Sequence, residues 1–367
     1  MRSIAICGLV LAAAVALVVS GTAPARPASG SRVTVYASGL NNPRGLIFGP
    51  DRMLYVAEGG IGGTQAMSAS DCPQVPEPIG PYGGGFTSRI ARIAPGGARV
   101  FVADTLPSSQ TSAASGALVS GVAALAFVGN RLYGVEAGAG CSHGLGHTAN
   151  TVFRVNRDGT TADVANLSAF AATHPVAQPE DEDFEPDETW YSLVDVAGAL
   201  YAVGPNHGEL DRVLPSTGAI SRVVDISASQ GHIVPTALAY DRGSFYVGNL
   251  GTFPVKPGSS VILKVTPSGQ VSKWASGLST VLGLAFDRKH RLYALESMTA
   301  PGFPGPNELH TGKIVRIGPN GSQTTVATGF SFPTGMTMGP DNALYVSNFG
   351  FGGPPGAGQI LRVTLPA

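Results

Sequence analysis

The feature that most constrains the fold is a pattern that occurs six times along the 367 residues. Each copy begins with a short, mostly apolar segment, and a second segment containing a tyrosine follows after a tight turn. The paired segments are 43–48 with 54–56, 122–127 with 132–133, 191–196 with 200–202, 235–240 with 245–247, 281–286 with 292–294, and 333–338 with 344–346. A repeat of this kind predicts one supersecondary unit per copy, stacked against its neighbours.

A third segment in each copy leads into a glycine turn, and a fourth leads on to the next copy, as in residues 261–265, 267–269 and 271–278. Short strands joined by Gly, Asn and Asp turns are typical of four-stranded antiparallel blades. The composition agrees, because 50 Gly, 28 Pro and only 13% charged residues favour strands and turns over amphipathic helices. We therefore predict an all-β, six-bladed β-propeller built from NHL-like repeats.

The two ends of the chain supply the strongest argument for a closed ring. The last copy stops at residues 360–364, which form its third segment, so its fourth strand is missing. Residues 33–40 have the fourth-strand pattern of residues 271–278, and both end in Ala-Ser-Gly-Leu. We predict that 33–40 is the outer strand of the last blade, which removes an open edge from the ring.

The N-terminus has the pattern of an export signal. Arg2 precedes an uncharged apolar run over residues 4–20, and small residues around Ala23 and Ala25 resemble a cleavage site. We predict a signal peptide over 1–25, a linker over 26–32 and one propeller domain over 33–367. The mature protein is then secreted, periplasmic or bound in the cell envelope, without a membrane span. The alternative is a signal segment retained as an anchor.

Charge and cysteine content narrow the partners. The formal net charge of −1 does not favour a nucleic-acid partner, and we expect a monomer. Cys72 and Cys141 are the cysteines that remain after processing, and such a pair in an oxidising compartment predicts a disulfide.

The long insertions indicate a binding face. Residues 59–87, 137–150, 251–260, 297–311 and 350–358 each follow a second strand, and 168–189 link two blades, so all lie on one face. Cys72 and Cys141 fall in neighbouring insertions on that face, which makes their bridge geometrically reasonable. Loops on a rigid scaffold carry function more often than tight turns do. We place a small-molecule or protein partner there.

Polar residues end the second strands near the predicted channel mouth. They are Glu58, Glu136, Asn206, His207, Asn249, Glu296 and Asn348. An oxygen-rich ring suits Ca²⁺ or another divalent cation in the central channel, where it would polarise a carbonyl or activate water. The alternative is that these side chains cap backbone groups or line a hydrated channel. Arg44, which opens the first inner strand, is a candidate for holding an anionic ligand, and its alternative is an ordinary surface arginine.

Two further patterns are assigned to the surface. His143 and His147 have the spacing of a helical zinc pair, but the glycines between them argue against a helix, so we expect exposed histidines. The acidic run over residues 180–188 could bind calcium, yet it lacks the glycine pattern of a calcium-binding loop. We expect it to be a solvated acidic loop.

Several motifs resemble one known family. They are residues 42–45 leading to 55–60, residues 81–90, and residues 246–254 with 257–258. The mature chain resembles the ScyD/ScyE family of secreted propellers, named from scytonemin biosynthesis. The resemblance implies a propeller outside the cytoplasm with a part in maturing an exported metabolite, and it supplies no catalytic residue.

Three functions therefore remain open. The first is a ScyD/ScyE-type binding or accessory protein. The second is a metal-dependent hydrolase like the lactonases related to senescence marker protein 30, although their ligand motifs are not apparent in this chain. The third is a platform for protein–protein interaction. Whether the chain is an enzyme is left undecided by the sequence.

Overall fold

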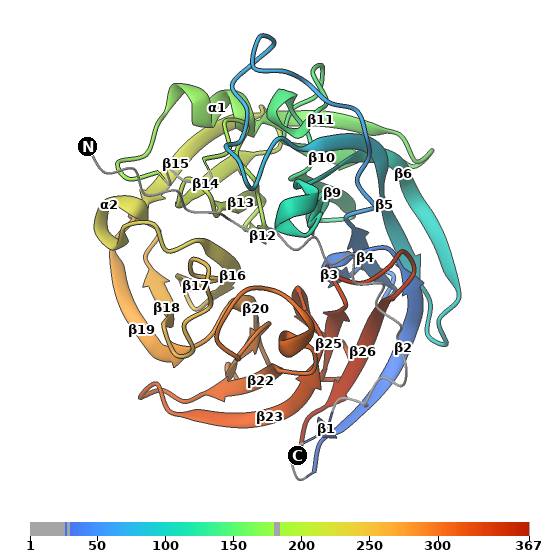
Figure 1. Ribbon diagram of the computed structural model, residues 1–367. Helices are drawn as coiled ribbons and strands as arrows, with labels where there is room; N and C mark the ends of the chain where they lie inside the picture. The colour runs from blue at the N-terminus through green and yellow to red at the C-terminus, as the bar shows by residue number, and fades with distance from the viewer. Residues whose placement is uncertain (1–25, 28–29, 180–183, 367) are drawn as a thin grey trace, which may run out of the picture.

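A computed structural model describes residues 26–27, 30–179 and 184–366, and its strands form six antiparallel sheets around a common axis (Figure 1). The predicted six-bladed propeller is confirmed. Blade 1 contains β3 (Pro43–Phe48), β4 (Leu54–Glu58), β5 (Gly83–Ile93), β6 (Arg99–Gln110) and β7 (Val119–Ser120). Blade 2 contains β8 (Val122–Val128), β9 (Arg131–Glu136), β10 (Thr151–Val155) and β11 (Thr161–Asn166).

Blades 3 to 6 follow the same order from the axis outward. Blade 3 contains β12 (Ser192–Val196), β13 (Ala199–Gly204), β14 (Glu209–Leu214) and β15 (Ala219–Asp225). Blade 4 contains β16 (Pro235–Asp241), β17 (Ser244–Asn249), β18 (Ser260–Val265) and β19 (Val271–Leu278). Blade 5 contains β20 (Val281–Phe286), β21 (Leu292–Glu296), β22 (Gly312–Ile317) and β23 (Gln323–Phe330). Blade 6 contains β24 (Gly335–Met338), β25 (Ala343–Asn348), β26 (Gly358–Thr364) and β2 (Arg32–Leu40).

The ring closes where the sequence predicts. Strand β2 pairs antiparallel with β26, with Val33 opposite Val363 and Leu40 opposite Gly358. Figure 1 shows the blue N-terminal strand beside the red C-terminal one in a single blade. A further short strand, β1 (Arg26–Pro27), pairs with β23 in blade 5, within the stretch predicted to be a linker.

The repeated tyrosine explains how neighbouring blades pack. Tyr345 of blade 6 meets Phe48 of blade 1 edge to face at 4.8 Å between ring centroids. Tyr55 meets Phe127 of blade 2 at 5.1 Å in the same way. Tyr246 of blade 4 likewise meets Phe286 of blade 5 at 5.0 Å. Each of these phenylalanines lies in the inner strand of the following blade, so an aromatic pair packs three of the six blade interfaces at that end of the ring.

The face opposite those aromatic pairs carries the long connections. The described part of the chain includes two short α-helices there, α1 (Leu167–Thr173) and α2 (Ser227–Gln230), both between blades. Three 3₁₀ turns occur in other connections, at Ala113–Ser115, Cys141–His143 and Pro306–Glu308. The first predicted insertion is shorter than expected, because residues 83–87 extend β5. Among the described residues, no helix is long and apolar enough to cross a membrane.

Candidate functional site

Three of the predicted ring residues act as caps between blades. The side chain at the end of a second strand accepts a backbone N–H from the link that enters the same blade. Glu58 accepts from Asn41 at 2.7 Å, Glu296 from Ser279 at 2.8 Å, and Asn348 from Ser331 at 2.8 Å. A buried N–H without a partner would cost about 1–3 kcal/mol, so these contacts stabilise the joints between blades.

Two other ring residues also bond to backbone groups. Asn249 donates to the carbonyl of Ile233 at 2.8 Å and accepts from the N–H of Val261 at 2.7 Å. Glu136 accepts from the N–H groups of Ala137 and Gly138, both at 3.1 Å. Burial raises the pKa of Glu136 to about 8, and these two hydrogen bonds offset only part of that rise. A contact between these five side chains and a ligand remains a prediction.

The buried carboxylates of blades 1 and 5 each have a cation opposite them on the third strand. Glu58 pairs with Arg89 at 2.9 Å, and Glu296 pairs with Lys313 at 3.3 Å. These residues also face each other in the strand register. Glu58 also lies 4.0 Å from Arg99, so each acid has at least one positive charge beside it, which is what a buried carboxylate requires.

The central channel itself is predominantly apolar. A cavity of about 250 Å³ lies between the inner strands and is lined chiefly by small and aliphatic residues such as Leu46, Leu125, Leu238, Leu284 and Met336. None of its lining residues is a carboxylate, an asparagine or a histidine, and none of the seven predicted ring residues is among them. Hard divalent cations require several oxygen ligands, so the side chains of this cavity do not fit such an ion.

Arg44 lies beside Tyr191, whose side chain reaches across the channel. The Tyr191 hydroxyl donates to the carbonyl of Thr334 at 2.6 Å, which connects the entry to blade 3 with the entry to blade 6. The Arg44 guanidinium donates to the carbonyl of Val119. Burial lowers the pKa of Arg44 and raises that of Tyr191 to about 12, while the contact between the two opposes both changes. Arg44 remains charged, because an arginine does not deprotonate in proteins.

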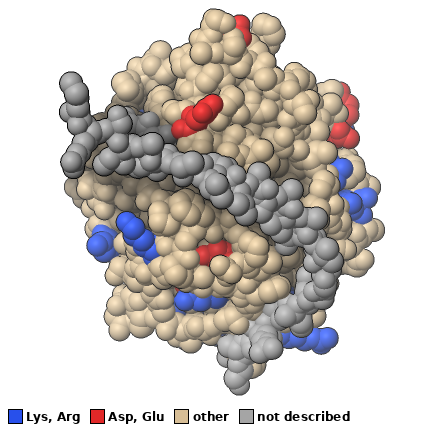
Figure 2. Space-filling model, viewed as in Figure 1, with Lys and Arg blue, Asp and Glu red and all other residues tan. Residues whose placement is uncertain are grey.

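The surroundings of Arg44 and Tyr191 are apolar and uncharged. Tyr191 packs against a cluster of buried apolar residues from several blades, namely Val255, Leu282, Met298, Phe332 and Phe351. No carboxylate within the described chain forms an ion pair with Arg44, and its side chain stays partly accessible. Charged side chains on the described surface of this face are scattered (Figure 2).

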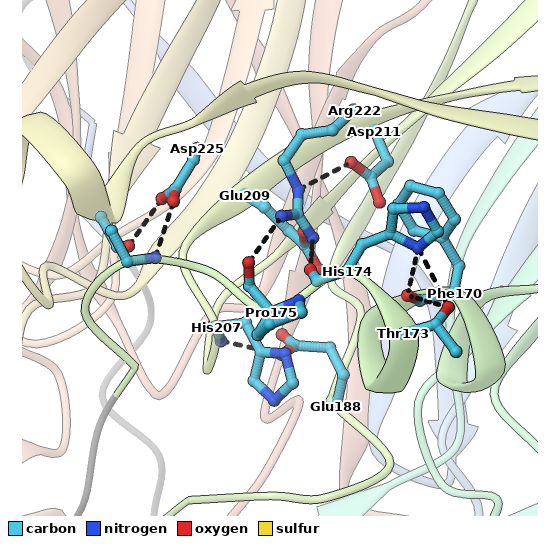
Figure 3. Close-up of polar contacts among 12 residues, drawn as sticks. Phe170, Thr173, His174, Pro175, Glu188, His207, Glu209, Asp211, Arg222 and Asp225 are labelled. Carbon is cyan, nitrogen blue, oxygen red and sulfur yellow. Dashed lines mark hydrogen bonds and ion pairs between the residues drawn. The ribbon is translucent and has the colours of Figure 1, made fainter.

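A second polar group lies in blade 3 and includes two of the predicted residues. The Glu188 carboxylate accepts the backbone N–H groups of Asn206 at 3.0 Å and His207 at 2.8 Å. His207 Nδ1 lies 3.1 Å from Glu188 Oε2, and His207 Nε2 lies 3.1 Å from the carbonyl oxygen of Glu185. Asn206 accepts from the N–H of Glu185 at 2.9 Å. Figure 3 shows Glu188 and His207 facing each other below Glu209.

Strand β14 adds two more carboxylates to this group. Glu209 and Asp211 are fully buried, and Arg222 of β15 is their common cation: it contacts Glu209 directly and lies 3.6 Å from Asp211. Burial raises the pKa of Glu209 to about 8 and that of Asp211 to about 7. Burial raises the pKa of Glu188 as well, with Glu209 as the next cause. We call Glu188, His207, Glu209, Asp211 and Arg222 the blade-3 cluster.

Glu188 was not a candidate from the sequence, because it belongs to the acidic run expected to be solvated. That expectation is wrong for the described part of the run. Glu188 is buried, Asp187 accepts from Ser142 Oγ at 2.6 Å, and the Tyr82 hydroxyl donates to Glu185. The segment folds inward because its carboxylates accept hydrogen bonds from three other loops. Residues 180–183 lie outside the described chain.

The Cys72–Cys141 disulfide is confirmed and joins the insertions of blades 1 and 2. The same loops correct the expectation for His143, which is fully buried rather than exposed. Its Nδ1 lies 2.8 Å from Ser109 Oγ, and its ring meets that of Tyr82. Burial lowers the pKa of His143 to about 4. His147 is exposed, as expected, so the two histidines do not form a pair.

Comparison with known proteins defines the class by fold alone. A gluconolactonase from Xanthomonas campestris superposes with a TM-score of 0.56 at 14% identity, over 95% of this chain and 99% of that one. A glucose dehydrogenase gives 0.54 at 16% identity, over 90% and 98%. A streptogramin B lyase gives 0.50 at 10% identity, over 91% and 98%. The chain is thus a six-bladed propeller of the kind found in gluconolactonases.

The particular family is not identified by these comparisons. No family model matches the chain, and no curated protein matches it. The three structures named above carry names of three different activities on one architecture, and a shared fold does not imply a shared function. The function must therefore be argued from the side chains of this chain.

Proposed function

We propose that the mature protein is an exported binding propeller that takes a small organic anion at the loop-face mouth of its channel. Arg44 holds the anionic group, and the apolar cluster around Tyr191 accommodates the rest of the ligand. A carboxylate on an aromatic or aliphatic body fits this combination. Such a role agrees with the ScyD/ScyE resemblance, in which the protein accompanies the maturation of an exported metabolite. The confirmed disulfide supports an oxidising compartment.

The observation that carries the proposal is the charge on Arg44. Removing a charged group from water is costly unless a counter-charge compensates it. Arg89 satisfies this requirement with Glu58, whereas among the described residues Arg44 has a carbonyl and a phenol beside it and no carboxylate. A guanidinium presents five donors in a planar fork that matches a carboxylate. A bound anion would supply the missing counter-charge.

The test is a thermal-shift and calorimetric screen of purified mature protein with aryl and alkyl carboxylates, such as benzoate, indole-3-acetate and octanoate. We expect at least one acid to bind, and Arg44→Met to weaken it at least tenfold, because a charge-assisted contact contributes about 1.5–3 kcal/mol. Arg44→Lys should retain part of the affinity. The matched control is Arg92→Met, whose arginine pairs with Asp51 on the blade.

A result in which no acid binds, or in which Arg44→Met and Arg92→Met bind equally well, would reject the proposal. The screen should also include the amide of each bound acid. An amide that binds as tightly as its acid would show that the negative charge of the ligand does not contribute to binding at Arg44.

The rival function is a metal-assisted hydrolase, favoured by the shared fold with a gluconolactonase. Among the predicted ring carboxylates, Glu58 and Glu296 are engaged with backbone N–H groups and cations, and Glu136 accepts from two backbone N–H groups. Glucono-1,5-lactone hydrolysis with added Ca²⁺, Mn²⁺ or Zn²⁺ tests it. Turnover that is lost in folded Glu58→Gln or Glu296→Gln protein would favour the hydrolase over the binding protein.

A further inference from the structure

We propose that the blade-3 cluster binds a divalent transition-metal ion through Glu188, His207 and Glu209. The three side chains are buried, and one ligand atom from each lies within 4.8 Å of the others. They come from different segments: Glu188 from the link between blades 2 and 3, and the other two from the turn between β13 and β14 and the start of β14. This site is independent of the anion site proposed above.

The orientation of His207 is the first reason. A carbonyl oxygen can only accept a hydrogen bond, so Nε2 must carry the proton that it shares with Glu185. In the neutral ring, Nδ1 then presents its lone pair to a carboxylate oxygen of Glu188 at 3.1 Å. Two lone pairs face each other only when a proton or a metal ion lies between or beside them, so this pair of acceptor atoms is a place that a metal ion can occupy. Metal-binding histidines characteristically donate their other ring nitrogen to a carbonyl or carboxylate, as His207 does.

The distance is the second reason. Two ligands of a tetrahedral zinc ion, each about 2.1 Å from the metal, lie roughly 3.4 Å apart. The 3.1 Å between His207 Nδ1 and Glu188 Oε2 is close to that separation. A metal ion placed beside both atoms would therefore require little movement of either side chain.

The charge balance is the third reason. Glu188, Glu209 and Asp211 contribute three buried carboxylates, and Arg222 contributes one positive charge. Glu209 Oε1 is buried and has no hydrogen-bond partner, although its residue is fully enclosed. A divalent cation would neutralise the remaining charge directly.

The donor set selects the ion. Calcium prefers six to eight oxygen ligands, and magnesium keeps several waters. One imidazole with two carboxylates instead suits zinc or another first-row divalent ion. This proposal differs from the Ca²⁺ site predicted in the channel in both the ion and the location. The proposed ion lies between the link that joins blades 2 and 3 and the third strand of blade 3.

The experiment uses the mature protein after treatment with a chelator and dialysis. Zinc or manganese is added alone, and metal content, calorimetric stoichiometry and melting temperature are measured. We expect one metal ion per chain and a rise in melting temperature of about 4 °C at a metal concentration 100 times the dissociation constant. Glu188→Gln and His207→Gln should each reduce the affinity at least tenfold and remove most of this rise.

The matched control is Glu296→Gln, which changes a buried carboxylate whose charge is already balanced by Lys313. It should keep the full metal-dependent rise. Circular dichroism of the metal-free variants shows whether each variant is folded. The site is then tested by the difference in melting temperature between metal-free and metal-loaded protein of the same variant. Wild-type protein that binds no metal, or binding that survives both cluster substitutions, would overturn the proposal.

Discussion

Blades 1, 5 and 3 place different charges at the same structural position. The last ladder pair between the second and third strands is Glu58 with Arg89 in blade 1, and Glu296 with Lys313 in blade 5. In blade 3 the equivalent pair is Gly204 with Glu209. The acid has moved to the third strand, where the other two blades carry the base, and the cap comes from Glu188 in the preceding link.

This difference separates structural carboxylates from a carboxylate cluster with unbalanced charge. In blades 1 and 5 each acid accepts from one N–H group and has at least one cation beside it, so its negative charge is compensated within the protein. In blade 3 the acids outnumber the base three to one. The uncompensated negative charge in blade 3 can attract a cation, while the capped carboxylates of blades 1 and 5 stabilise their own blades.

The largest expected change in stability follows from removing the disulfide. The disulfide holds the loop that contains Ser142, which contacts the segment leading into blade 3. Replacing both Cys72 and Cys141 by Ser opens a link between residues 69 apart, which should cost about 4 kcal/mol of unfolding free energy. Ser142, next to Cys141, donates twice to Asp187, so the segment around Glu188 should become more sensitive to protease. Urea unfolding and limited proteolysis measure the two effects. Equal protease sensitivity in wild type and variant would show that the bridge does not support the cluster.

The second effect tests a balanced cap. Glu58→Ala leaves the Asn41 N–H and the Arg89 guanidinium without their acceptor. Because Arg89 is partly exposed, water recovers some of this loss, and we expect about 3 kcal/mol of destabilisation. Urea unfolding measures it, with Glu58→Gln as the milder comparison. A cost below about 1 kcal/mol would mean that Glu58 is not a structural cap and would reopen its role in a ligand site.

The sequence was sufficient for the fold because every blade repeats the same local information. The match between residues 33–40 and 271–278 predicts a pairing that spans the whole chain, and β2 with β26 confirms it. The tyrosine marks predict strands and, as the aromatic pairs show, also record contacts between blades. A contact that recurs between blades requires the same residue type in each repeat, and this makes the repeat visible in the sequence.

The candidate sites left a weaker trace because the residues that form them differ from one repeat to the next, and because Glu188 lies in an insertion that does not repeat. His207 and Asn206 were candidates, but their partner Glu188 was concealed in an acidic run. Tyr191 was assigned to an inner strand, although β12 begins one residue later and its side chain crosses the channel. One signal was readable: third strands carry Arg89 or Lys313 where blade 3 carries Glu209. Comparing charges between repeats would have identified the unusual blade.

The smallest effect concerns pH and follows from the unbalanced charges. Because burial raises the pKa of Glu209 to about 8 and of Asp211 to about 7, the folded protein holds protons that the unfolded chain releases near pH 4. Stability is therefore greatest at mildly acidic pH and falls as the pH rises toward 8. In metal-free protein we expect a loss of about 2 kcal/mol between pH 6.5 and pH 8, measured by urea unfolding. Below pH 6.5 the buried His143 acts in the opposite direction, because burial lowers its pKa to about 4 and the unfolded chain then binds the additional proton. Asp211→Asn should reduce the loss, because an amide releases no proton, whereas Glu58→Gln should leave it unchanged. A stability that rises over this range would contradict the unbalanced cluster, since it would mean that the three acids are ionised and fully compensated in the folded protein.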